Sequence, residues 1–169
     1  ENNLAGSVFN TAGLWAYSLT APEAPRSGSI TIKDNVIRNN GPNGGLGAQT
    51  YSSDGDAGQV TVEGNVIEDN TREDLRASSS MIGSEAVNGG IAGQVRVVNN
   101  RFVDNRSGAY GGGVWVYSNP GKGDAEGLYV AHNIITDNQI TSTSSSGGGL
   151  FVEAPASSTA GMSGADVTL

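Results

Sequence analysis

The sequence predicts an all-β fold, a right-handed parallel β-helix of about five coils with three short parallel sheets and uncapped ends. Three observations predict it. Short β-branched runs alternate with stretches of Gly, Asn, Ser and Asp, which is the pattern of strands and turns. A pair of Asn residues recurs at intervals of 30, 35 and 33 residues. A Gly-rich, then apolar, segment follows each pair. We therefore treat residues 1–169 as a single domain.

Each repeat places two Asn residues five positions apart. The first column is Asn3, Asn35, Asn65, Asn100 and Asn133, and one coil starts near each of them. The second column is Asn40, Asn70, Asn105 and Asn138, with Val8 where the first coil should have its Asn. Asn tolerates a left-handed backbone at a turn, and its amide both donates and accepts hydrogen bonds. We expect each column to form a ladder that satisfies buried polar groups.

Three short strands make up each coil. In the run at 60–62, Val60 and Val62 are expected to point inward and Thr61 outward. The third strand is expected in the segments that are Gly-rich and then apolar, namely "NGGLGA" at 43–48, "GGGVWV" at 111–116, "GGGLFV" at 147–152 and, with a weaker match, "SSMIGS" at 79–84. Parallel coils stack about 4.8 Å apart, and loops of different length project from the side of the stack.

Composition excludes several classes of function. The net charge of −8 and the pI of about 4.4 argue against nucleic acid as a partner. The absence of Cys excludes disulfides and thiolate metal sites. No apolar run approaches the roughly 20 residues of a membrane-spanning helix.

The coil "FVDNRSGAYGGGV" resembles the F-x-x-N and G-G-x-I repeats of chlamydial polymorphic outer membrane proteins, and of related β-helical autotransporter passengers and surface adhesins. Phe102 and Asn105 match the first motif, and Ile37, Ile67 and Ile135 replace the Phe in other coils. Gly112, Gly113 and Val114 match the second motif, as do Gly148, Gly149 and Leu150. The resemblance implies an exported, cell-surface or secreted protein.

The two ends of the sequence fit together in register. When "GADVTL" is written before "ENNLAG", a junction forms that aligns without a gap with residues 60–66; it consists of Val167, Thr168, Leu169, Glu1, Asn2, Asn3 and Leu4. The last coil would thus be completed by residues 1–4 of the next copy. A β-helix cannot close into a ring, so such a junction would propagate into a fibre. Whether units are separate chains or one period of a tandem polypeptide stays open, as does the alternative of an arbitrarily trimmed fragment.

Aromatic residues recur at outward positions of the third strand. The position after the first apolar residue is expected to hold, in successive coils, Trp15, Gly47, Gly83, Trp115 and Phe151, with Tyr17 and Tyr117 pointing the same way two residues on. We call Trp15, Trp115, Phe151, Tyr17 and Tyr117 the aromatic stripe. It could bind sugar rings or pack fibre against fibre. Stacking of the rings on one another, which would only stiffen the sheet, explains the aromatic stripe equally well.

No catalytic residue is predicted, because the acidic residues, Asp34, Glu63 and Glu1 among them, scatter over the repeats instead of converging on one sheet face. The single His132 lies in a turn beside Asn133 and is expected to be structural. Asp54, Asp56, Asp124 and Glu126 could hold Ca²⁺, but their spacing is not that of a known calcium loop, so polar loops are favoured and no cofactor or metal is expected.

The leading hypothesis is a structural subunit of an extracellular fibre, with copies of itself as partners in a linear homopolymer. The second hypothesis is a stalk or passenger segment of a larger cell-surface adhesin that contacts glycans or other cells. A fragment of a carbohydrate-active β-helix enzyme is the third.

Overall fold

The structure is a computed structural model that describes residues 13–20, 24–42, 44–73, 78–142 and 147–155, and the backbone of residues 167–168. Every regular element in this part of the chain is a β-strand, and every strand pairing is parallel. The predicted all-β parallel solenoid is confirmed. No helix of the described residues is long and apolar enough to cross a bilayer.

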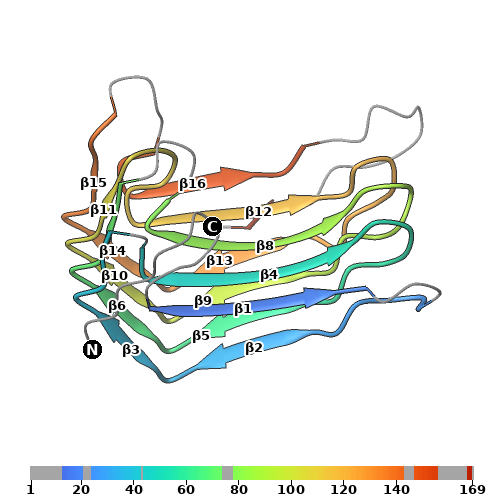
Figure 1. Ribbon diagram of the computed structural model, residues 1–169, viewed down its shortest axis with the longest axis horizontal. Helices are drawn as coiled ribbons and strands as arrows, with labels where there is room; N and C mark the ends of the chain where they lie inside the picture. Colours follow the sequence, from blue (N-terminus) through green and yellow to red (C-terminus); the bar gives the residue numbers. More distant parts are fainter. Residues whose placement is uncertain are drawn as a thin grey trace.

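The strands form four parallel sheets that run along the solenoid (Figure 1). Sheet I consists of β1 (Leu14–Leu19), β4 (Leu46–Ser52), β8 (Ser80–Ala86), β12 (Val114–Asn119) and β16 (Leu150–Glu153). Sheet II consists of β2 (Ile30–Lys33), β5 (Val60–Glu63), β9 (Val95–Val98), β13 (Leu128–Ala131) and β17 (Val167–Thr168). Sheet III consists of β3 (Val36–Arg38), β6 (Val66–Glu68), β10 (Arg101–Val103) and β14 (Ile134–Thr136). Sheet IV consists of β7 (Thr71–Arg72), β11 (Arg106–Ser107) and β15 (Gln139–Ile140).

The fourth sheet differs from the prediction of three. Its strands are only two residues long and directly follow the second Asn column, for example β11 after Asn105. The turn at each second Asn bends the chain away from sheet III, and the two residues beyond it pair with the coils on either side. These dipeptides are too short to show a strand pattern in the sequence. The described strands make about four turns, and residues 1–12, which include the start of the first predicted coil, lie outside the described residues.

One apolar core fills the inside of the coils. Val60 and Val62 are fully buried and Thr61 between them is not, because successive side chains of a strand point to opposite faces. Phe102 is the largest fully buried side chain. At the two ends the equivalent residues are only partly buried: Leu14, Ala16 and Ile30 at one end and Ile135, Leu150 and Val152 at the other. The solenoid therefore leaves an apolar cross-section incompletely covered at each end of its described part.

Left-handed backbone occurs one position earlier than the sequence analysis expects. The ladder Asn residues have ordinary φ angles, and the residue before each has a φ between 53° and 67°; these residues are Asp34, Gly64, Asn99, His132, Asn39, Asp69, Asp104 and Asp137. Asp, Asn and Gly adopt this conformation at low cost. The turn is completed before the ladder residue, whose side chain is then free to point inward. His132 is an exposed turn residue.

Candidate functional site

The first Asn column forms a continuous hydrogen-bond ladder along the solenoid. Each Asn donates its backbone N–H and its side-chain Nδ2–H to the Oδ1 of the Asn in the next coil. For Asn65 and Asn100 these distances are 2.9 and 3.0 Å. The same pair of bonds joins Asn35 to Asn65 and Asn100 to Asn133. The Nδ2 group also donates to backbone oxygens, such as that of Val62 from Asn100.

The second column repeats this arrangement. Asn40 donates to Asn70, Asn70 to Asn105 and Asn105 to Asn138, each through backbone N–H and Nδ2–H at 2.8–3.1 Å. Asn70 and Asn105 are 0% and 1% exposed. A buried amide with unmade hydrogen bonds is costly, so each coil depends on the presence of the next.

The ladders have a direction, which makes the two ends of the solenoid different. At one end the Oδ1 of Asn35 receives no hydrogen bond from any described residue. At the other end the backbone N–H of Asn133 and of Asn138 has no acceptor among the residues that the structure describes. Among the described residues, one end therefore offers an acceptor of the first ladder, and the opposite end offers the backbone N–H of Asn133, whose Nδ2 already donates to the backbone oxygens of Val97 and Ala131.

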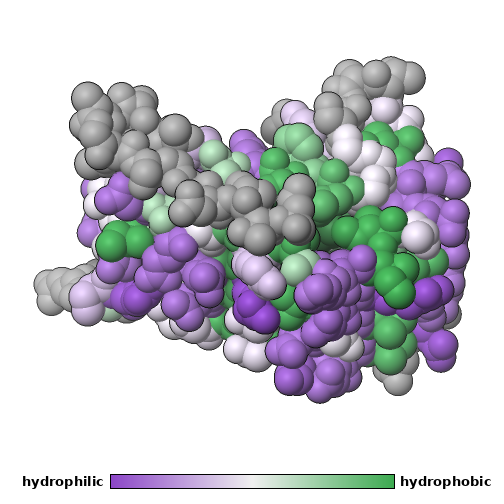
Figure 2. All heavy atoms as spheres, turned by 180° about the vertical axis from the view of Figure 1, so that it is seen from behind, coloured by the Kyte–Doolittle hydropathy of each residue, from purple (hydrophilic) through white to green (hydrophobic). Residues whose placement is uncertain are grey.

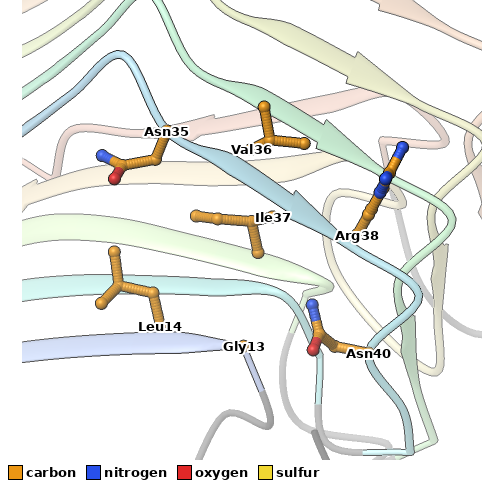
Figure 3. A pocket seen from close by; sticks show the side chains of 7 residues that line it. All are labelled: Gly13, Leu14, Asn35, Val36, Ile37, Arg38 and Asn40. Carbon is orange, nitrogen blue, oxygen red and sulfur yellow. The ribbon is translucent and has the colours of Figure 1, made fainter. Parts of the chain in front are cut away.

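The acceptor end also contains a hollow of about 390 Å³, which is lined by Gly13, Leu14, Asn35, Val36, Ile37, Arg38 and Asn40. Leu14 and Ile37 point into it from β1 and β3, and Asn35 and Asn40 flank them (Figure 3). Val36 is 61% exposed. The hollow is thus the partly covered core of the first described coil, bordered by the first described Asn of each ladder.

The predicted junction is described only in part. The backbone of Val167 and Thr168 forms β17, which pairs in parallel with β13 and places Val167 opposite Leu128. Leu128 is in turn opposite Val95 and Val95 opposite Val60, which is the alignment expected from the sequence. Leu169, Glu1, Asn2, Asn3 and Leu4 lie outside the described residues.

The outer face of sheet I carries the aromatic stripe, with one correction to its register. The column beside Trp15 runs through Gly47, Met81, Trp115 and Phe151, so Met81 takes the place expected for Gly83. Gly83 instead lies between Gln49 and Tyr117. The sequence alignment was wrong because Ser80 holds the inward position that the other coils give to Leu or Val.

Two glycines let aromatic rings lie flat on the sheet. A Cβ at Gly47 would lie 1.7 Å from the ring of Trp15, and one at Gly83 would lie 2.2 Å from the ring of Tyr117. The rings of Trp115 and Tyr117 have centroids 4.9 Å apart, and Trp15 stacks on Tyr17 at 6.4 Å. The stripe therefore covers bare backbone of the coil next to it.

Tyr110 is an aromatic contact that sequence reasoning missed. Its ring stacks on Phe151 at 5.1 Å and lies 5.9 Å from Trp115. Tyr110 precedes the Gly-rich segment and belongs to no strand, so the alternation of strand residues gives no signal for it.

A groove of about 330 Å³ lies on the same outer face, and it is lined by Gln49, Met81, Glu85, Trp115, Tyr117, Asn119, Glu153 and Pro155. Glu85 and Glu153 thus line one groove, which corrects the expectation that the acids scatter. Both were missed because neither belongs to a motif. Their outward alternation with core residues of β8 and β16 is the signal that could have found them.

The chemistry of the groove is set by its burial. Burial raises the pKa of Glu85; a hydrogen bond from Asn119 Nδ2 to Glu85 Oε1 of 3.1 Å opposes this rise, and the nearby charge of Glu153 adds to it. Burial also raises the pKa of the Tyr117 phenol, and the charge of Glu85 adds to that effect. The groove therefore disfavours negative charge on its own residues.

The residues considered for Ca²⁺ make hydrogen bonds within the protein. Asp54 accepts from Ser53 and Asn88, and Asp56 accepts from the backbone of Ile91. Glu126 accepts from Arg26, Gln59 and the backbone of Gln94, at 2.7, 3.1 and 3.0 Å, and so connects separate coils. No three His, Asp or Glu side chains of the described ranges gather in a way that could hold a metal ion.

The surface seen from behind is mixed, with hydrophilic residues over much of it and hydrophobic residues exposed between them (Figure 2).

Comparison with known proteins identifies the fold. A family model described as a right-handed β-helix region matches residues 2–159. No curated protein and no solved structure matches the chain.

Proposed function

We propose that this chain, which belongs to the right-handed β-helix family, is a structural subunit of an extracellular fibre. Copies stack head to tail, and Leu169 of one unit is followed by Glu1 of the next, so that the β-helix continues through the junction. The proposal includes no catalytic activity. Right-handed β-helices serve both enzymes and structural proteins, so the fold alone does not decide between them.

The observation that carries the proposal is the complementarity of the two ends. Among the described residues, one end offers the Oδ1 of Asn35, and the other offers the backbone N–H of Asn133. Asn3, the first-column residue expected between them in a fibre, lies outside the described residues. A first-column Asn of an adjacent coil would satisfy each. Because donors face acceptors only when all units point the same way, the contact is heterologous and propagates.

The apolar cross-sections support the same arrangement. Leu14 and Ile30 at one end, and Leu150 and Val152 at the other, are partly buried, although their equivalents in the middle coils are fully buried. Stacking a further coil on each end would remove this surface from water, at about 25 cal/mol per Å² of apolar area. The contact would combine backbone pairing with core packing.

The position of β17 indicates which residues of adjacent units would pair. This strand pairs with β13 along one edge, and β2 is the last strand of sheet II at the opposite end. In the fibre, β17 of one unit would also pair with β2 of the next. Val167 would then lie opposite Ile30, as Val60 does within the unit.

Sedimentation velocity and electron microscopy of the purified chain test the proposal. We expect filaments that persist in high salt, because the contact is apolar and backbone-paired and is therefore screened little. The Val167→Asp variant should remain monomeric, since position 167 pairs with buried Leu128. The Ile91→Asp variant is the control and should still form filaments, because Ile91 is 39% exposed and lies between β8 and β9, away from both ends. A wild-type chain that stays monomeric at high concentration would refute the fibre.

A stalk or passenger segment of a larger surface adhesin is the second candidate, and the aromatic stripe is the observation that favours it. Tyr17 of the stripe and Tyr110 beside it are 48% and 41% exposed, which leaves aromatic surface available to a ligand. In this case further coils of the same polypeptide would cover the two ends. Capture on immobilised glycans by a chain that does not form filaments would favour this function over the fibre.

A further inference from the structure

The groove on sheet I combines carboxylates with aromatic rings, and no residue that lines it carries a positive charge. Glu85 comes from β8, Trp115 and Tyr117 from β12, and Glu153 from β16. The walls therefore come from coils whose spacing is fixed by sheet I. Apart from Pro155, which follows β16, the residues that line the groove lie on strands of sheet I, so the groove is largely preformed.

The two carboxylates have no cationic partner among the described residues. The ion pairs in this part of the chain are Arg26–Glu126, Lys33–Glu63 and Arg38–Glu68, and they include neither Glu85 nor Glu153. The amide of Asn119 provides one hydrogen bond to Glu85 and no charge. A cation placed in the groove would offset the cost of two nearby negative charges in a partly buried site.

The aromatic residues favour the same ligand. The rings of Trp115 and Tyr117 lie with their centroids 4.9 Å apart at the wall of the groove. Aromatic rings attract cations through their quadrupole, most strongly for Trp, and the attraction grows when the cation is partly removed from water. Aromatic rings offer no oxygen ligands to a hydrated metal ion, whereas an alkylammonium group carries its charge on a partly apolar surface that packs against them.

We propose that this groove binds an organic ammonium group, with Glu85 and Glu153 supplying the opposite charge and Trp115 and Tyr117 the aromatic wall. The ammonium group could be carried by an amino sugar or by a lysine side chain, which share this chemistry. The site lies within a single unit and goes beyond the fibre proposal, because binding requires no assembly.

Fluorescence titration tests the proposal directly. The chain has two Trp residues, so the Trp15→Phe variant leaves Trp115 as the single reporter, and Trp15 does not line the groove. The first pair of probes is glucosamine and its neutral counterpart N-acetylglucosamine. The second pair is Nα-acetyl-lysine N-methylamide, whose ε-ammonium group is free, and the corresponding norleucine derivative. We expect saturable changes for the charged member of a pair and affinity at least about tenfold lower for its neutral partner. The pair that responds identifies the source of the ammonium group.

Variants assign the effect to the groove. The Glu85→Gln/Glu153→Gln double variant should weaken binding by at least about tenfold. The matched control is Glu63→Gln in sheet II, which removes one carboxylate away from the groove and should leave binding unchanged. Circular dichroism verifies that each variant is folded. Equal responses to charged and neutral probes, no response to any probe, or full affinity in a folded double variant would each overturn the proposal, with the monomer or fibre state left unaffected.

Discussion

Asn65 and Asn100 lie one above the other in successive coils, and Asn65 donates both its backbone N–H and its Nδ2–H to the single Oδ1 of Asn100. Both side chains are buried, with 1% and 2% exposure. One amide oxygen thus satisfies two buried donors of the neighbouring coil. The relationship makes the stability of each coil depend directly on the next.

Replacing Asn100 by Ala should lower the free energy of unfolding by about 1–3 kcal/mol, because the buried N–H groups of Asn65 would lose their acceptor. Chemical denaturation measures this loss. The exposed Asn88, replaced by Ala in the same way, is the control and should change stability by less than about 0.5 kcal/mol. Equal effects of the two substitutions would show that the ladder contributes nothing specific.

Replacing Gly83 by Ala should disturb the aromatic stripe, because the new Cβ would lie 2.2 Å from the ring of Tyr117. Tyr117 is 6% exposed and its ring must move outward, so we expect a loss of about 1–3 kcal/mol in unfolding free energy and a changed near-ultraviolet circular dichroism spectrum. The same Gly83→Ala substitution should then be made in the Tyr117→Ala variant, which lacks the ring. We expect a much smaller loss of unfolding free energy there, and an equal loss would contradict the packing of Tyr117 on Gly83.

Glu85 should make the protein more stable as the pH falls into the acidic range. Burial raises the pKa of Glu85 in the folded state above its unfolded value. The protonated side chain is then favoured by folding: this contribution is complete below the unfolded pKa and is lost as pH rises through the folded pKa. Denaturation midpoints of the wild type and Glu85→Gln should therefore converge at acidic pH, and the variant should be the more stable at neutral pH. A variant that is less stable at pH 7 would contradict the burial effect.

The contribution of Glu126 to stability should depend on pH in the opposite direction. Burial alone would raise its pKa, but hydrogen bonds from Arg26, Gln59 and the backbone of Gln94 together lower it. Its contribution to stability is therefore present above the unfolded pKa and is lost as pH falls through the folded value. In Glu126→Gln we expect a small loss, at most about 1 kcal/mol for this largely exposed ion pair, which disappears under strongly acidic conditions. A loss that persists at acidic pH would show that charge is not its cause.

The periodic features of the molecule could be predicted from the sequence. Val60, Val95 and Leu128 align in the structure as their spacing predicts, because identical turns bring the same position of each coil into register. The alignment was wrong at Met81, where a Ser occupies an inward position and removes the apolar signal. Sheet IV was not predicted, because dipeptides such as Thr71–Arg72 show no alternation.

The groove as a whole was not predicted, because its residues lie on four strands, with Pro155 beyond the last of them, and share no motif. Glu85 and Glu153 belong to different coils and occupy different columns of sheet I. Only the stacking of the coils places both beside Trp115. Spacing within one repeat therefore says little about a site that extends across several coils.

The most direct test of the central claim is the axial repeat of the assembled protein, measured by cryo-electron microscopy or fibre diffraction. If units continue one another's β-helix, each adds about five coils of about 4.8 Å, and the rise per unit should be roughly 24 Å, with β17 of one unit beside β2 of the next. An assembly whose rise is not close to this value, or one in which the ends of neighbouring units lie apart, would contradict it.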